Sequence, residues 1–136
     1  MVHALSEARR VLLPGGRLID LRPTMLNRRV ELLLPDATLF MGEIDSSNTF
    51  PDHVVANEAL DEALLAGEFG LEHMTTFAIL HDLDTLPDLR EFKSGFRRSV
   101  MSESIFEQID ALTAGQSGDF LIRIRREILI ARYRRL

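Results

Sequence analysis

The sequence contains no cysteine among its 136 residues. This absence excludes disulfide bonds, thiolate metal sites and a cysteine nucleophile, so the fold must be stabilised by packing alone. It also fits a reducing compartment, and we expect a cytoplasmic protein. The longest apolar runs, such as residues 128–131, are far shorter than the ~20 residues of a transmembrane helix. No basic and apolar leader opens the chain, so we expect a soluble protein without a membrane partner.

Basic residues are missing from a long stretch of the chain. Between Arg29 and Arg90 there is neither Lys nor Arg, whereas residues 120–136 carry six Arg against a single Glu. An acidic middle and a basic end can attract each other within one molecule or between two copies, although two solvated faces are the simpler interpretation. A nucleic-acid interface would need aromatic residues among clustered bases. Only Tyr133 lies among these arginines, so we expect no nucleic-acid partner.

The length is typical of one domain with one core, and we treat residues 1–136 as a single domain. Hydrophobic spacing predicts a helix over residues 4–13, which Pro14-Gly15-Gly16 ends. A strand is expected over residues 17–21. Two further strands, 30–34 and 38–44, are expected to form a hairpin.

The second half of the chain alternates helices and strands. A helix is predicted from a cap at Asp52 to Gly67, a strand over 71–80, and two helices capped by Thr85 and Ser102. Isoleucines at even positions within 120–133 predict a final strand that is covered on both faces. A terminal amphipathic helix is the rival interpretation of that segment. About five strands and four helices therefore indicate an α/β or α+β domain with a mixed sheet.

Residues 5–18, LSEARRVLLPGGRL, resemble the helix, tight turn and fifth strand of class I S-adenosylmethionine-dependent methyltransferases. In that family a run of the type L-x-E-x-x-R-V-L-x-P-G-G-x-L recurs in the C-terminal half of the domain. Residues 4–29 would contain these elements, in a fold resembling the C-terminal half of a Rossmann-like methyltransferase.

The resemblance also implies how the later segments are arranged. Within residues 71–136, the strands at 71–80 and 120–133 would form a pair whose last strand inserts antiparallel beside strand 17–21. Residues 30–45 depart from the family pattern as an inserted hairpin. Either this hairpin or a second copy of the chain would cover the free edge of strand 17–21.

The residues that hold the cofactor in this family have no counterpart here. Family members bind it with a glycine-rich turn after the first strand and an acidic residue at the end of the second. The eight glycines include no G-x-G run, and Gly15-Gly16 follows a helix. We therefore assign no catalytic, cofactor-binding or metal-binding residue, and expect S-adenosylmethionine only if a partner chain completes the site.

Four residues are candidates for a substrate rim. The resemblance places Arg22, Thr24 and Asn27 at the rim where methyltransferases receive substrate. His81 is the fourth, because the run His81-Asp82-Leu83-Asp84 brings an imidazole and two carboxylates to a strand end. Such a group can bind a divalent metal or act as an acid/base pair. Since the sequence indicates no further ligand, an ordinary loop is the simpler interpretation.

The remaining candidates have simpler explanations. His53 and His73 are isolated, and the serines at 46, 47 and 102 lack the flanking glycines of a nucleophile elbow. The apolar side chains of the middle region are expected in the core rather than around a ligand. They are Phe40, Met41, Phe69, Met74 and Phe77.

Three functional hypotheses remain. The first is a methyltransferase-like remnant or split domain, non-catalytic by itself, that acts as a homodimer or with a cofactor-binding partner protein. The second is a small-molecule binding module built on the same sheet. The third is the truncated C-terminal part of an active methyltransferase.

Overall fold

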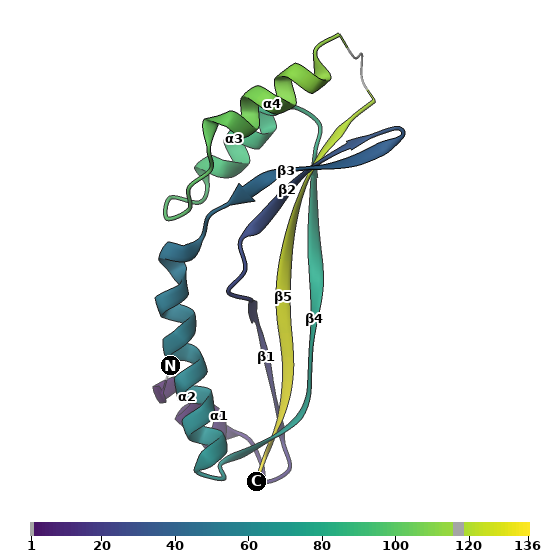
Figure 1. Cartoon of the computed structure of the whole chain (residues 1–136). Coiled ribbons are helices and arrows are strands. Elements are labelled where there is room, and N and C mark those ends of the chain that lie inside the picture. The colour runs from purple at the N-terminus through teal and green to yellow at the C-terminus, as the bar shows by residue number, and fades with distance from the viewer. Residues whose placement is uncertain (1, 116–118) are drawn as a thin grey trace. The chain divides into compact units, whose positions relative to one another are not determined.

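The computed structural model describes residues 2–115 and 119–136. Within them the chain forms four α helices and five strands (Figure 1). The helices are α1 (Val2–Val11), α2 (Phe50–Leu65), α3 (Leu86–Ser94) and α4 (Glu103–Thr113), with a 3₁₀ turn over Ser47–Thr49. The strands are β1 (Arg17–Pro23), β2 (Arg28–Leu34), β3 (Ala37–Ile44), β4 (Phe69–Leu83) and β5 (Leu121–Arg135).

Strand β5 is the centre of a five-stranded antiparallel sheet. It pairs with β1 along residues 128–134 and with β2 along residues 121–125, and β4 also pairs with it. Strand β3 pairs with β2 as the expected hairpin, with Leu34 opposite Ala37. The predicted α/β class with about five strands and four helices is confirmed. The sheet itself is antiparallel, and β5 pairs with β1, β2 and β4.

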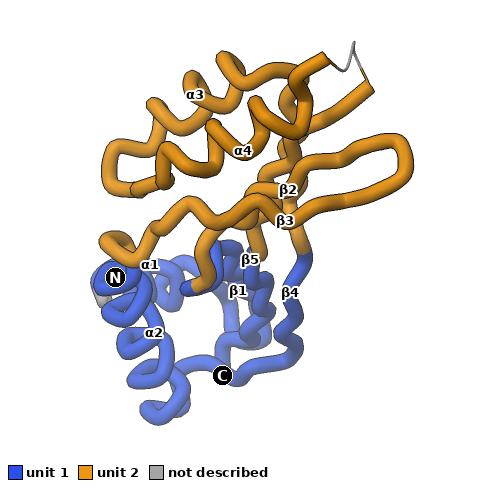
Figure 2. The backbone as a smooth tube through the Cα atoms, turned by 45° about the horizontal axis from the view of Figure 1, so that its top comes forward, with its two compact units in different colours: residues 1–25, 50–77, 128–136 blue, residues 26–49, 78–127 orange. Residues whose placement is uncertain are grey.

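The chain divides into two compact units (Figure 2). Unit 1 comprises residues 1–25, 50–77 and 128–136, and unit 2 comprises residues 26–49 and 78–127. Each unit has its own cluster of buried apolar side chains. The single core expected from the length is thus replaced by two smaller ones.

In unit 1, helices α1 and α2 cover one face of the strands. Leu5 of α1 and Leu60 of α2 are buried with Phe69, Ala131 and Tyr133. The small residues of α2 at positions 56, 59 and 63 are also buried, which lets the helix backbone approach the strands closely. The helix begins before Asp52, which lies in its first turn and is not the predicted cap. Pro51 explains the earlier start, because its fixed φ suits the first turn of a helix.

In unit 2, helices α3 and α4 pack on the β2–β3 hairpin and on the first part of β5. Fully buried Val30, Leu32, Leu89, Ile109 and Ile122 form the centre of this core. Both predicted caps are confirmed, since the side chains of residues 85 and 102 accept hydrogen bonds from backbone N–H groups of the first helical turns.

A bulge between Val30 and Glu31 bends the hairpin of unit 2 where Gly42 adopts a φ of +140°. A Cβ atom at position 42 would lie 2.7 Å from Cδ1 of Ile105. Glycine is therefore required here both for the backbone conformation and for the close approach of α4.

The buried side chains of β5 lie at even positions in the first part of the strand and at odd positions in its last part. Ile122 and Ile124 belong to the core of unit 2, whereas Ala131 and Tyr133 belong to the core of unit 1. The final segment is thus a strand and not the rival helix. Both faces of β5 carry apolar side chains, but the two faces are not buried at the same place along the strand. Each half of β5 buries only one set of alternate residues.

The hairpin β2–β3 does not cover the free edge of β1. It pairs with β5 instead, and β1 has no second strand partner among the residues that the structure describes. The expectation that this hairpin fills the edge of strand 17–21 is wrong. The register shows why, since β5 has 15 residues and is long enough to pair with β1 and β2 in succession.

Candidate association surface

Strand β4 lies at the outer edge of the sheet. Within the described residues it pairs only with β5, and every position from Leu71 to Asp82 is exposed. The expectation that Met74 and Phe77 lie in the core is wrong, because they are 55% and 43% exposed. Phe40 of β3 is also exposed, whereas Met41 and Phe69 are buried as expected. A long edge strand with exposed apolar side chains is a ready template for pairing with another chain.

One face of the unit 1 sheet carries exposed apolar side chains as well. Leu18 of β1 and Tyr133 of β5 pair opposite each other and point to the core. Their neighbours in alternation, Ile19 and Leu21, therefore point the other way and are 54% and 59% exposed. We define the association surface as Ile19, Leu21, Met74 and Thr76 together with the outer edge of β4.

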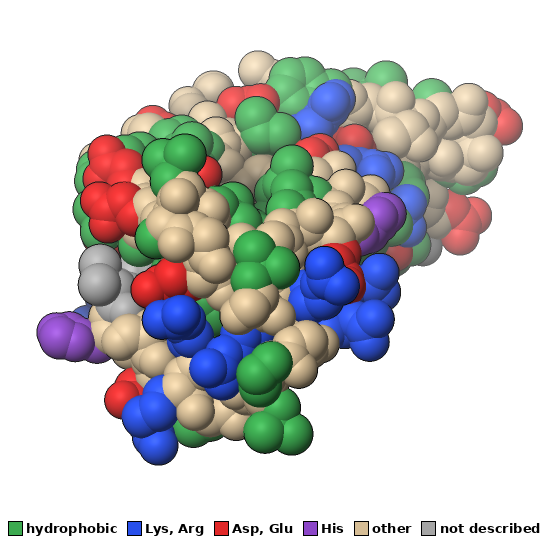
Figure 3. Space-filling model, turned by 90° about the horizontal axis from the view of Figure 1, so that it is seen from below, with side chains coloured by type: hydrophobic (Ala, Val, Ile, Leu, Met, Phe, Trp, Pro, Cys, Tyr) green, Lys and Arg blue, Asp and Glu red, His purple; other side chains and the backbone are tan. Residues whose placement is uncertain are grey.

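A cluster of charges lies next to this surface in unit 1. Glu72 of β4 forms ion pairs with Arg17 at 3.1 Å, Arg132 at 2.9 Å and Arg134 at 3.9 Å. The hydrogen bond from Arg17 is the main cause that lowers the pKa of Glu72, and the charges of the other two arginines add to it. Figure 3 shows basic side chains gathered on the face seen from below, with hydrophobic side chains exposed beside them.

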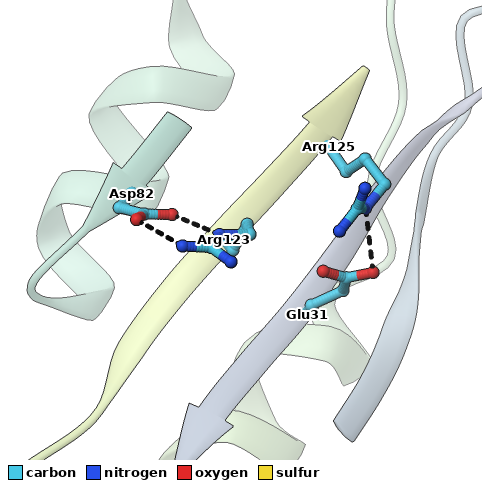
Figure 4. Close-up of polar contacts among 4 residues, drawn as sticks. All are labelled: Glu31, Asp82, Arg123 and Arg125. Atoms are coloured by element: carbon cyan, nitrogen blue, oxygen red, sulfur yellow. Dashed lines mark hydrogen bonds and ion pairs between the residues drawn. The ribbon is translucent and has the colours of Figure 1, made fainter. Parts of the chain in front are cut away.

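Two arginines of β5 in unit 2 bind carboxylates on its two neighbouring strands (Figure 4). Arg123 donates two hydrogen bonds of 2.7 Å to Asp82 of β4, and Arg125 donates one of 3.4 Å to Glu31 of β2. The Arg123 guanidinium is the main cause that lowers the pKa of Asp82. The carboxylates of β4, Glu72 and Asp82, are thus both paired with arginines of its own chain.

The four rim candidates are divided between the two units, with Arg22 and Thr24 in unit 1 and Asn27 and His81 in unit 2. Arg22 lies 2.9 Å from Asp20 within β1 and is largely buried. The side chain of Asn27 donates to Glu43 at 3.1 Å and accepts from the backbone N–H of Ser46 at 2.9 Å, which is a structural role at the base of the hairpin.

The other two rim candidates are Thr24 and His81. Thr24 is half-buried and follows β1, in unit 1, whereas Asn27 and His81 belong to unit 2. The ring of His81 packs on Phe92 with centroids 4.8 Å apart.

The segment from His81 to Asp84 does not have the geometry of a metal site. Its aspartate at position 82 is held by Arg123, and no group of three or more His, Asp or Glu side chains suited to a metal occurs in the described part of the chain. The loop interpretation is wrong for most of this run, because residues 81–83 belong to β4 and only Asp84 follows the strand.

The glycine turn after α1 does not fit a nucleotide cofactor. The N–H of Gly15 donates to the carbonyl of Arg135 at 2.9 Å, and the carbonyl of Gly16 accepts from the N–H of Arg135 at 2.8 Å. A Cβ atom at Gly16 would lie 2.8 Å from the carbonyl oxygen of Leu13. These glycines allow a close contact between the turn and neighbouring backbone. The backbone N–H of Gly15 and the carbonyl of Gly16 are hydrogen-bonded to β5, so they are not available to a ligand.

In comparisons with protein-family models, with curated proteins and with solved structures, the chain has no match. Over the described residues, none of the helices is long and apolar enough to cross a membrane.

Sequence reasoning found β4 as a strand but missed that it is an exposed edge. The signal was present in the charge pattern, since residues 69–83 contain no Lys, Arg or Pro. Those residue types usually protect edge strands from pairing. The same absence is also part of the stretch without basic residues between Arg29 and Arg90, and apolar residues alone do not show whether a strand is buried or exposed.

Proposed function

We propose that this chain is a non-catalytic association domain of methyltransferase-like architecture, which pairs with a second copy of itself through β4. The observation that carries the proposal is the exposed edge of β4, with apolar side chains and no protecting residue along it. Burial of apolar surface and the satisfaction of edge N–H and C=O groups would both favour association.

The charges of β4 favour a second copy as the occupant. Its two carboxylates, Glu72 and Asp82, are already neutralised by arginines of the same chain. Between them the strand carries only His73 and His81 as titratable groups. In an antiparallel pair centred near Thr76, neither carboxylate would face its own copy, and two-fold pairing is the commonest oligomer symmetry.

The methyltransferase-like origin is supported by the strand arrangement. Strand β5 lies antiparallel beside β1 and also pairs with β4, which is the order that the resemblance of residues 5–18 implies. The non-catalytic assignment is supported by the bonds that occupy the glycine turn and the rim candidates Arg22 and Asn27. S-adenosylmethionine would bind only if a partner chain completes the site.

Sedimentation velocity over a concentration series tests the association. The wild-type chain should show a reversible monomer–dimer equilibrium, and Thr76→Lys should remain monomeric because it places two lysines near each other at the interface. Leu65→Lys is the matched control, since Leu65 of α2 is 88% exposed and lies outside the association surface. A monomeric wild-type chain that pairs only with another protein would replace the homodimer with a heteromeric complex.

Calorimetric titration with S-adenosylmethionine tests the non-catalytic assignment separately. We expect no saturable heat at micromolar ligand. Saturable heat would mean that this chain alone forms a cofactor site, and the assignment would then be wrong whatever its oligomeric state.

A further inference from the structure

Two loops of unit 2, one after β3 and one between α3 and α4, are fixed against each other by hydrogen bonds. The backbone N–H of Asp45 donates to Val100 at 2.7 Å, and that of Val100 donates back at 2.8 Å. Arg98 donates to the carbonyl of Asn48 at 2.6 Å, and the amide of Asn48 donates to the carbonyl of Arg98 at 3.4 Å. These hydrogen bonds hold the two loops in a fixed arrangement.

A pocket of ≈ 380 Å³ lies between these loops and the adjoining strands of unit 2. Four arginines and two serines among its lining side chains carry the argument: Arg28, Arg97, Arg98, Arg126, Ser46 and Ser99. No Asp or Glu occurs among the described residues that line it. The volume is within the range of small-molecule clefts, and the polar groups converge from several elements.

Arg28 is the most deeply placed of these cations. It is 5% exposed, donates to Oγ of Ser46 at 2.8 Å and lies over the ring of Phe96 at 4.1 Å. Oγ of Ser46 in turn lies 3.2 Å from Oγ of Ser99. All of these partners are neutral. Within the described part of the chain, this buried positive charge is therefore oriented by hydrogen bonds but has no carboxylate paired with it.

Arg126 adds a second uncompensated cation on β5. Its Nε is buried and has no hydrogen-bond partner among the described residues. Burial alone lowers the pKa of this guanidinium, because no carboxylate opposes the desolvation. Buried donors in proteins normally have partners, and one that lines a pocket without a partner indicates a group that a ligand supplies.

We propose that this pocket binds the phosphate group of a small phosphorylated ligand. Guanidinium groups bind phosphate oxygens with charge-assisted, often bidentate hydrogen bonds. A dianion with oxygens in three directions matches cations that enter from β2, from the loop after α3 and from β5 better than a planar carboxylate does. The serine hydroxyls supply further donors.

Calorimetric titration of the full chain with inorganic phosphate, phenyl phosphate and acetate at matched ionic strength tests this inference. Both phosphates should bind with saturable heat and acetate should bind more weakly. If phenyl phosphate binds more tightly than inorganic phosphate, the natural ligand is a phosphorylated molecule, as proposed. If the two bind equally, the pocket recognises free phosphate instead. If neither phosphate binds better than acetate, the proposal is wrong.

The variants Arg126→Gln and Arg97→Gln separate binding from folding. Each should weaken phosphate binding about tenfold, because each removes one charge-assisted contact. Without phosphate, Arg126→Gln should unfold at the same temperature as the wild type or higher, because it removes an uncompensated buried cation. Arg10→Gln on α1 is the control, since Arg10 is paired with Glu7 in unit 1, and should bind normally. Unchanged phosphate affinity in both pocket variants would overturn the proposal.

Discussion

Arg123 donates two hydrogen bonds of 2.7 Å to the carboxylate of Asp82, and these bonds join the central strand β5 to the edge strand β4. At the other end of β4, Glu72 is held by Arg132 of the same central strand and by Arg17. The carboxylates of the edge strand are thus turned to the protein's own arginines. The stretch between them has neither a charged carboxylate nor a lysine to repel another strand.

Asp82→Asn should lower the Tm near neutral pH and have little effect in strong acid. The Arg123 guanidinium holds the pKa of Asp82 below its ordinary value of 3.8. Its contribution to stability is therefore present above about 3.8 and is lost as the pH falls through the lower folded value. Thermal unfolding of both proteins at about pH 7 and about pH 2 measures this, and an equal difference in Tm at both values would contradict it.

Glu72→Gln should destabilise the chain more than Glu7→Gln does at low salt. Glu72 forms ion pairs with three arginines, whereas Glu7 is paired with Arg10 within one helix. Both effects should shrink at ~1 M salt, where charges are screened within about 3 Å. Thermal unfolding at two salt concentrations gives the comparison, and equal losses in the two variants would show that the cluster adds nothing.

Tyr133 should ionise above the ordinary value of 10.0. It is the one tyrosine of the chain, which has no tryptophan, so tyrosinate absorbance reports on it alone. Burial is the main cause that raises its pKa, and the negative charge of Asp20 adds to it. The stability that it contributes is present below about 10 and is lost as the pH rises through the folded value. Titration with the ordinary pKa in the folded chain would show that this core is open to solvent.

Gly42→Ala should destabilise unit 2 by about 1–3 kcal/mol, because a side chain at a φ of +140° is strained and its Cβ would press on Ile105. The matched control is Gly95→Ala. Gly95 has a φ of −68°, and a Cβ there would lie 3.4 Å from the carbonyl oxygen of Phe92. The control should change stability by less than about 1 kcal/mol. Denaturant unfolding compares the two, and similar losses would remove the special role of Gly42.

Local signals in the sequence were sufficient for most of the elements. Thr85 and Ser102 cap helices because their hydroxyl groups accept from nearby N–H groups, which depends only on adjacent residues. The β2–β3 hairpin and the strand at β5 follow from alternating apolar residues in the same way. The bounds differ by a few residues, as at Phe50, where proline shifts the start of α2.

Tertiary relationships could not be predicted from these local signals. Alternation in β5 shows which residues share a face, but not that Ile124 and Tyr133 enter different cores. The arginine pocket joins Arg28, Ser99 and Arg126, which lie far apart in the sequence and carry no common motif. The exposure of Met74 and Phe77 depends on which strand ends at the edge of the sheet, and composition does not determine that order.

Mixing two oppositely charged edge variants tests the central claim most directly. Thr76→Lys and Thr76→Glu should each sediment as a monomer, because like charges would meet across a two-fold pair of β4 strands. An equimolar mixture should sediment as a dimer, since opposite charges would then face each other. If the mixture stays monomeric, or if either variant alone dimerises as the wild type does, β4 is not the surface through which this chain associates.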